Sequence, residues 1–376
     1  MLMNKRTKFF TYLKVLFFLT LGLLIAGAIV IKTQPGLAAT IADNYLRPVI
    51  GTDRTFVLEQ FFFNVSDKTA QLEYKFKSPT APQFLNQINN NNLSSSSLDL
   101  TPISVPSSQS LQDEGVWHNL SVNVSLGKEV LAYTFVRPDP TRAFATVSLV
   151  QMDMSQLRIG AVAGSKEPGT TLGNPGPGTI PQNIIDSGNL VAAFNGGFLY
   201  VDGNYGMIVG NKTYVPLKND VGTIVGYTDG TVKILNYTGQ DLGKNVAFAR
   251  QNGPLLIDNS AVVLDATDMK VAKGKVLHGG IYTWRSGIGV TKSGNLIYAA
   301  GNNLSPTTLA KSLQMAGAVS AIQLDINPSQ VRFDLFDRNA SGTYDVTPLN
   351  KELAYLSNKE QYLKGHTRDF FYVYKQ

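Results

Sequence analysis

The stretch VAAFNGGFLYVDGNYGMIVG, residues 191–210, interrupts an apolar run with an asparagine and a pair of glycines. The run VAAF is typical of a buried strand, and Asn195, Gly196 and Gly197 follow it directly. Glycine weakens a strand, so it often marks a bulge or a place where another group must approach the backbone closely. Asn-Gly is itself a strong turn signal. The sequence therefore leaves two interpretations open, a tight turn or a ligand site at the end of a strand.

The composition describes a chain that can bury a large core without disulfide bonds. Of its 376 residues, 43% are hydrophobic, 16% are charged and none is cysteine. The lack of cysteine excludes a cysteine nucleophile and any Cys-based metal site. His118, His278 and His366 are the only histidines, and they are not at metal-binding spacing. We therefore expect no zinc site and predict no cofactor, while a divalent cation is left open.

The net charge of +6 belongs largely to a membrane-targeting pattern, and we expect no nucleic-acid partner. The basic residues that flank the apolar segment 15–31 are Lys5, Arg6, Lys8, Lys14 and Lys32. Four precede the segment and one follows it, which predicts a cytoplasmic N-terminus and an exported remainder. We favour a single-pass membrane anchor over a signal peptide cleaved after Ala39, because the apolar run is long for a signal peptide. Either way, the main domain is expected to be extracellular or periplasmic.

Composition divides the chain into four parts. Residues 1–39 form the N-terminal anchor or signal segment, and residues 40–77 have apolar positions at helical spacing beyond Pro48, as expected of a membrane-proximal helix. Residues 78–110 are rich in Asn, Ser and Pro, which is typical of a flexible linker. The folded domain is therefore predicted to span residues 111–376.

This domain is predicted to be β-rich, of the mixed α+β class. Strands are expected in 120–126, 130–138, 145–154, 157–164, 189–197 and 222–235. Asp229, Ser293 and Ser341 each precede a glycine and predict turns between strands.

One helix is expected after Ser305, a good N-cap, with Pro306 in its first turn and an end near Gly317. It lies between two apolar runs. Residues 294–325 therefore form a βαβ-like unit whose two strands are expected to be parallel.

Polar residues at the ends of apolar runs are the candidates for a site. Asp325 closes such a run in IQLDINPSQ, although aspartate is also a common turn residue. Arg285 lies among aromatic and small residues, where a guanidinium would bind phosphate or carboxylate or make a structural salt bridge. Asn252 and Gly253 repeat the Asn-Gly theme. Glu114 is a weaker candidate, better explained as a structural carboxylate in a loop.

The order of these segments resembles the phosphodiester glycosidase family, which includes the enzyme that uncovers mannose 6-phosphate on lysosomal hydrolases and many bacterial envelope proteins. The motifs that carry the resemblance are NGGF at 195–198, NGP at 252–254, the arginine at 285 before a Gly-rich strand, and a strand ending in LD at 324–325. The resemblance covers residues 111–376 and is strongest from 190 to 330. It implies hydrolysis of a glycosidic bond to a phosphodiester, with release of a sugar.

Carried over to this sequence, the resemblance implies catalytic roles for Asn195, Arg285 and Asp325. Arg285 would neutralise the phosphate, and Asp325 would bind sugar hydroxyls or transfer a proton. The amides beside the two glycines would approach phosphate oxygens. The expected substrate-binding residues are Gly196, Gly197, Phe198, Asn252, Gly253, Trp284, Asn327 and Ser329.

The sequence departs from the family where LDGGGSS is replaced by LDINPSQ, residues 324–330. Proline has no N–H, so Pro328 would damage a phosphate site built from these amides. We therefore expect a membrane-anchored hydrolase that releases a sugar from a phosphodiester-linked or related envelope glycan, such as an exopolysaccharide. The alternative is a non-catalytic module that binds such a glycan in the same cleft. The expected partners are this glycan and, through the N-terminal helix, the membrane.

Overall fold

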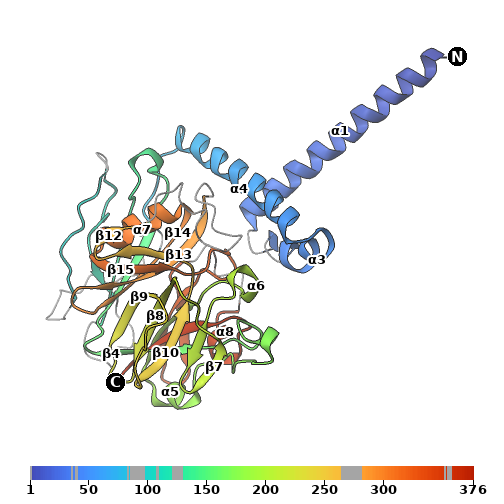
Figure 1. Ribbon diagram of the computed structural model, residues 1–376. Helices are drawn as coiled ribbons and strands as arrows, with labels where there is room; N and C mark the ends of the chain where they lie inside the picture. Colours follow the sequence, from blue (N-terminus) through green and yellow to red (C-terminus); the bar gives the residue numbers. More distant parts are fainter. Residues whose placement is uncertain are drawn as a thin grey trace. The chain divides into compact units, whose positions relative to one another are not determined.

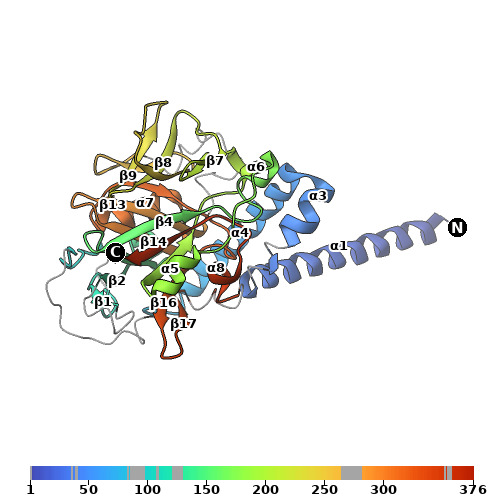
Figure 2. The same cartoon turned by 90° about the horizontal axis from the view of Figure 1, so that it is seen from below.

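A computed structural model describes residues 2–34, 37–38, 41–82, 84, 98–106, 110–120, 130–263, 282–350, 353 and 358–376 (Figures 1 and 2). The chain divides into two compact units, Met1–Ala70 and Gln71–Gln376. The expected strand at 120–126 lies almost wholly outside the described residues.

Unit 1 is helical. It contains α1 (Leu2–Thr33), the π-helix η1 (Ala42–Leu46), α3 (Arg47–Ile50) and most of α4 (Thr52–Tyr74). In α1, Phe9–Gly27 is long and apolar enough to cross a membrane, with a mean hydropathy of 2.1, although a signal sequence would pass the same test. The predicted helix beyond Pro48 is present as α4, and Pro48 itself lies in the first turn of α3, where its missing N–H costs nothing.

Unit 2 is β-rich, and its described part contains three antiparallel sheets. The eight-stranded sheet has the order β1 (His118–Asn119), β2 (Leu131–Val136), β3 (Val147–Met152), β14 (Leu296–Leu304), β13 (Thr283–Thr291), β15 (Ala318–Gln323), β11 (Leu255–Asp258), β12 (Ala261–Val262). The β10 sheet has the order β7 (Lys212–Val215), β6 (Met207–Val209), β10 (Val246–Gln251), β8 (Val221–Tyr227), β9 (Val232–Tyr237). The β5 sheet has the order β17 (Tyr344–Pro348), β16 (Phe333–Arg338), β5 (Leu190–Asn195), β18 (Phe370–Lys375), β4 (Leu157–Val162). The predicted α+β fold class is thereby confirmed.

Short helices connect these strands. They are η4 (Pro140–Arg142), η5 (Thr170–Leu172), α5 (Gln182–Ser187), α6 (Tyr200–Gly203), α7 (Pro306–Met315) and α8 (Gln361–Lys364). Among them α7 forms as its sequence predicts, because the Ser305 hydroxyl accepts the Thr308 amide and Gly317 follows the helix at φ +94°.

The predicted βαβ-like unit is β14–α7–β15. Both strands pair antiparallel with β13, which lies between them, so they run parallel to each other without sharing hydrogen bonds. Leu309 and Leu313 of α7 are fully buried against this sheet, and Figure 1 shows α7 beside β13 and β14.

The three expected turns all join antiparallel strands. Gly230, Gly294 and Gly342 adopt positive φ angles in the hairpins β8–β9, β13–β14 and β16–β17. Glycine adopts such angles without the steric cost that a Cβ atom imposes.

The main core lies between the sheets of unit 2. Phe194, Tyr298, Phe333 and Phe371 form a buried aromatic cluster, with Phe194 and Phe333 stacked at 5.7 Å between ring centroids. On the other side of the β5 sheet, α5 and α8 cover a smaller core (Figure 2).

Two residues from the expected linker belong to the core of unit 2. Phe84 packs against Tyr133 with 4.9 Å between ring centroids, and Leu98 is buried in the cluster beneath α7. Burial of such side chains stabilises a fold by about 1.5–3 kcal/mol each. The domain boundary at Leu111 stays a prediction, and these contacts provide a test of it.

Candidate functional site

The ends of four strands from the three sheets are joined by hydrogen bonds. Asn195 ends β5, Gln251 ends β10, Gln323 ends β15, and Asp369 comes directly before β18. Asn252, after β10, donates to the carbonyls of Gln323 and Leu324 at 2.7 and 3.1 Å. The meeting point therefore gathers loop residues from all three sheets.

Asn195 ties the β5 sheet to the eight-stranded sheet. Its Nδ2 donates to Ser286 Oγ and to the Gly196 carbonyl, both at 3.0 Å. Its Oδ1 accepts from Tyr298 OH at 3.0 Å and from the Arg332 amide at 3.1 Å. An amide side chain has two donor hydrogens and two acceptor lone pairs. All four are used within the protein, so Asn195 positions its neighbours.

The glycines after Asn195 admit a carboxylate of the protein itself. A Cβ atom at Gly196 would lie 2.0 Å from Asp369 Oδ2, and one at Gly197 would lie 2.7 Å from Asn252 Oδ1. The amides of Gly196, Gly197 and Phe198 donate to Asp369 O, Asp369 Oδ2 and Asn252 Oδ1. The Asp369 carboxylate therefore approaches the backbone of NGGF closely, which is one of the reasons for which a strand contains glycine. A phosphate would have to displace these internal acceptors to use the same amides.

Asp369 holds the glycine turn and forms a buried ion pair with Arg250. Arg250 Nε lies 2.8 Å from Asp369 Oδ2, and Nη2 lies 3.0 Å from Oδ1, which is the bidentate geometry of a guanidinium and a carboxylate. Arg250 also donates to the carbonyls of Phe198 and Gln251. Both side chains are about 1% exposed, so the pair is structural.

A second acidic and basic pair stands beside the first. Asp325 Oδ2 accepts from Arg368 Nη2, which also donates to the Gly197 carbonyl at 3.1 Å. Asp325 Oδ1 accepts the amides of Ile326 and Asn327 at 2.7 and 2.8 Å. The side chains are 5% and 10% exposed, so this pair is more accessible than the Arg250–Asp369 pair.

Burial and charge act in opposite directions on these groups. Burial raises the pKa of the Asp325 carboxyl, while the Arg368 guanidinium and the two backbone amides oppose that shift. The pKa of Arg368 is raised because the charges of Asp325, Asp369, Glu167 and Asp202 outweigh its own desolvation. Asp325 is therefore a carboxyl that is held near an arginine and is easier to protonate than an exposed aspartate.

Arg285 donates hydrogen bonds to the two strands that flank β13. Its Nε donates to the Leu304 carbonyl at 2.7 Å, and its Nη1 donates to Gln323 Oε1 at 2.9 Å. Side chains alternate along a strand, so Arg285 and its neighbour Ser286 project to opposite faces of β13. Burial lowers the pKa of Arg285 to about 9. The residue that touches both Asn195 and the Asp325 carbonyl is Ser286.

The other expected binding residues lie in different surroundings. Phe198 packs with Tyr205, Val221 and Ile326 in a small cluster. Ile326 directly follows Asp325 in the sequence. Trp284, by contrast, is buried in the main core. Gly253 has a positive φ of 72°, and its carbonyl accepts the Gly222 amide.

Asn327 Oδ1 accepts the amide and the hydroxyl of Ser329 at 2.9 and 2.8 Å, so LDINPSQ forms a turn stabilised by its own side chains. The predicted substrate contacts of these residues remain predictions.

The weaker candidate Glu114 is structural. Its carboxylate lies 2.6 Å from Arg137 Nη2 in an ion pair in which both side chains are buried. Among the described residues, no group of three or more acidic, cysteine or histidine side chains is placed to hold a metal ion.

Sequence reasoning missed Arg250, Arg368, Asp369, Ser286 and Tyr298. Arg250 lies two residues before Asn252, and Arg368–Asp369 stands directly before an apolar strand in HTRDFF. Asp325 was identified because a charged residue stands at the end of a buried strand. The charged pair Arg368–Asp369 stands at the start of one, so the same criterion would have found it.

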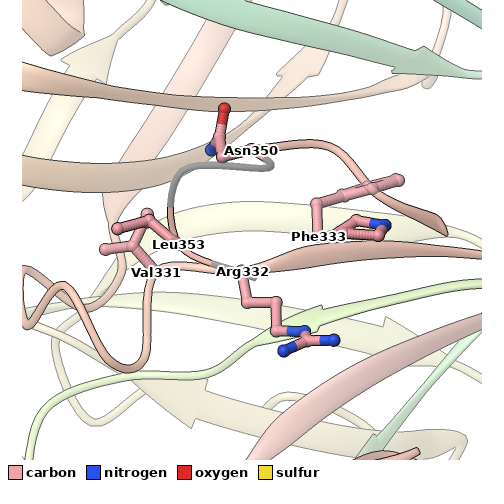
Figure 3. A pocket seen from close by; sticks show the side chains of 6 residues that line it. Val331, Arg332, Phe333, Asn350 and Leu353 are labelled. Atoms are coloured by element: carbon pink, nitrogen blue, oxygen red, sulfur yellow. The ribbon is translucent and has the colours of Figure 1, made fainter. Parts of the chain in front are cut away.

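A small pocket lies beside Arg332 (Figure 3). Val331, Arg332, Phe333, Pro348, Asn350 and Leu353 line it, and its cavity volume is about 10 Å³, about the space of one water molecule. Typical small-molecule pockets measure about 300–1,000 Å³. In the figure the Arg332 guanidinium points away from Asn350. The pocket is therefore too small to be the main binding site for a glycan.

The fold and the site define an α+β domain with two buried aspartate–arginine pairs where three sheets meet. The model of the phosphodiester glycosidase family matches residues 188–325, which confirms the predicted resemblance to this family. The match begins just before β5 and ends at Asp325.

Two solved structures are similar to this chain. The catalytic domain of zebrafish N-acetylglucosamine-1-phosphodiester alpha-N-acetylglucosaminidase, auto-inhibited by its pro-peptide, shares 15% identity, with 69% of this chain and 88% of that chain covered and a TM-score of 0.41. A hypothetical protein from Synechocystis shares 16% identity, with 69% and 62% covered and a TM-score of 0.31. No curated protein is found to match the chain.

Proposed function

We propose that this protein is an exported, membrane-anchored hydrolase that cleaves a sugar from a phosphodiester-linked glycan of the cell envelope. The family match over residues 188–325 supports a glycosidase-type function. The observation that carries the proposal for this chain is the pairing of Asp325, at the end of the matched range, with Arg368, outside it. An acid and a cation in contact are the two groups that a sugar phosphodiester requires.

Arg368 is proposed to bind the phosphate. A guanidinium matches phosphate oxygens in a bidentate manner, and Arg368 is the more exposed of the two arginines paired with aspartates at this site. When a phosphate replaces Asp325 as its partner, the Asp325 carboxyl loses the charge that favours its ionised form. Its pKa should then rise further, because burial remains.

Asp325 is proposed to donate a proton as a general acid. Water attacks the anomeric carbon and loses a proton to the solvent. The bond from that carbon to the phosphate oxygen breaks, this oxygen takes the proton that Asp325 donates, and the solvent then reprotonates Asp325. A carboxyl with a raised pKa suits this transfer near neutral pH. The products are a free sugar and a glycan that carries a terminal phosphate.

Asn195 and Arg285 are proposed to act indirectly. Asn195 holds Ser286, whose Oγ donates to the Asp325 carbonyl at 3.0 Å. Arg285 holds Gln323, two residues before Asp325. Both would fix the direction in which β15 delivers the carboxylate, so their loss should lower turnover without removing a reacting group.

A non-catalytic glycan-binding module is the alternative, favoured by one observation. The amides of Ile326 and Asn327 are engaged by Asp325, and Pro328 has no amide hydrogen, so this turn offers little to a transition-state oxyanion. Such a module would use Arg368 for binding and leave the phosphodiester intact.

The test is hydrolysis of a panel of sugar-1-phosphodiesters and cell-wall polymers by the purified full chain, with sugar release as the readout. Asp325→Asn should lower turnover by about 10²–10⁴-fold, the range for loss of a general acid. Asp258→Asn, at an exposed aspartate, is the matched control and should have no effect.

Binding without turnover, measured by calorimetry and weakened by Arg368→Ala, would favour the alternative. The absence of both turnover and binding across the panel would refute the proposed function.

A further inference from the structure

The outward side of helix α4 combines large apolar and basic side chains. Arg54, Val57, Leu58, Phe61, Asn64 and Lys68 are all exposed and recur at helical spacing; together they are called the α4 stripe. Val57 is 63% exposed and Phe61 is 47% exposed. Such side chains in a continuous stripe indicate an interaction surface, whereas single exposed apolar residues need no explanation.

The charges along this part of α4 are separated by side. Arg54 and Lys68 stand at the two ends of the stripe. Glu59 lies off the stripe and is bonded to Arg47 of α3 at 3.0 and 3.1 Å, and Asp67 is buried. The stripe therefore presents an apolar centre with positive ends, which is the pattern of helices that lie on anionic lipid surfaces.

The stripe lies close to the end of the apolar window in α1. That window ends at Gly27, and a Cβ atom at Gly27 would come within 2.9 Å of Phe62 Cζ. Gly27 and Phe62 thus touch inside unit 1, and Phe62 directly follows Phe61 of the stripe. Where α1 leaves the hydrocarbon layer, α4 is already beside it. Val49 of α3 is 81% exposed.

We infer that the α4 stripe lies in the membrane–water interface, so that unit 1 contacts the bilayer through two elements. The inference rests on the proposed membrane placement of α1. The occupant of the stripe is a lipid surface with anionic headgroups. Val57, Leu58 and Phe61 enter the boundary between headgroups and acyl chains, while Arg54 and Lys68 contact lipid phosphates. Described exposed apolar side chains beyond residue 77, such as Leu172 and Val201, stand singly and form no such stripe.

The chain has no cysteine, so single cysteines can report on each position. Val57→Cys and Phe61→Cys carry an environment-sensitive nitrobenzoxadiazole label in the full chain, reconstituted into vesicles of phosphatidylcholine and phosphatidylglycerol. Leu16→Cys in α1 is the control for lipid contact, and Val201→Cys is the control for water contact. Quenching is measured with doxyl-labelled lipid and with aqueous iodide.

Labels at positions 57 and 61 should be quenched by doxyl lipid, and their iodide quenching should be about threefold or more below that at position 201, as expected for side chains below the headgroups. Replacing Arg54 and Lys68 by glutamine should increase iodide access in the anionic vesicles and leave it unchanged in vesicles of phosphatidylcholine alone.

Iodide quenching at 57 and 61 equal to that at 201, with position 16 in lipid, would overturn the inference and leave the α1 anchor intact. Shielding from both quenchers together with energy transfer between labelled copies would show that a second copy covers the stripe, which also overturns it. Lack of lipid quenching at position 16 would refute the anchor and, with it, this inference. None of these outcomes bears on sugar release by unit 2, which tests the proposed function separately.

Discussion

Replacing Gly196 by alanine should destabilise unit 2 by forcing Asp369 out of place. The added Cβ would lie 2.0 Å from Asp369 Oδ2 and 2.6 Å from both its Cγ and its backbone oxygen. The carboxylate cannot simply swing aside, because Arg250 and the Gly197 amide hold it. Gly196 itself donates to the Asp369 carbonyl, so the backbone cannot retreat without losing that bond.

The magnitude follows from two contributions. Overpacking a tight interior costs about 1–3 kcal/mol. Breaking a buried ion pair by removing one partner costs about 3–5 kcal/mol, and a displaced Asp369 would lose part of that. We expect a decrease of about 3 kcal/mol in the free energy of unfolding, or a Tm lower by about 6 °C at about 2 °C per kcal/mol for a domain of this size.

Urea and thermal unfolding followed by circular dichroism would measure the change. Gly173→Ala is the control, since a Cβ there meets nothing within 4 Å and only the positive φ of 76° is strained, at about 1–2 kcal/mol. The same Gly196→Ala change is also made in an Asp369→Ala background, where the obstructing carboxylate is absent. There its cost should fall by at least about 1.5 kcal/mol, a coupling expected of residues in contact.

A cost no greater than that of Gly173→Ala, or a cost unchanged in the Asp369→Ala background, would refute this reasoning. The glycine pair would then be explained by the turn alone.

Three further predictions concern unit 2. Asn195→Ala should cost about 2–4 kcal/mol in urea unfolding, because it leaves buried partners without their hydrogen bonds. A cost below about 1 kcal/mol, measured against an exposed control such as Asn236→Ala, would contradict this. Burial raises the pKa of Asp334 to about 6, so the folded state retains a proton that the unfolded state releases, and stability should fall by about 3 kcal/mol as the pH rises from about 4 to 6. Asp334→Asn should remove that slope from unfolding curves across pH, and an unchanged slope would count against it. A chain that starts at Leu111 should unfold at a lower temperature than one that starts at Gln71, because it lacks Phe84. The loss of Phe84 alone is comparable to a Phe→Ala change, which costs about 3–5 kcal/mol. Equal Tm values would support Leu111 as the domain boundary.

Local features of the fold could be predicted because their causes are local. Alternation or runs of apolar residues predicted β2, β5 and β8, and glycines after Asp229, Ser293 and Ser341 predicted the hairpins. Ser305 and Pro306 predict the N-cap and the first turn of α7. In each case the interacting groups lie within a few residues of one another.

The site was only partly predictable because its contacts are distant in sequence. Gly197 and Asp369 are 172 residues apart, and Arg368 and Asp325 are 43 residues apart. Nothing in either local pattern indicates which strand ends meet, since that depends on the order of strands in three sheets. Arg285 illustrates the limit, because the register of β13 decides whether Arg285 or Ser286 faces Asn195.

The departure LDINPSQ changes which groups are available to recognise a phosphate. Asp325 accepts the amides of Ile326 and Asn327, and Asn327 accepts from Ser329, so carboxylate and amide side chains of the turn itself occupy donors that an anion would need. The amides of the NGGF turn are likewise engaged by Asp369 and Asn252. Under the proposed function, the phosphate is then expected to bind to a side chain. Arg368 touches both turns, through Asp325 and the Gly197 carbonyl, and for that reason its substitution should affect substrate binding more than any single backbone position.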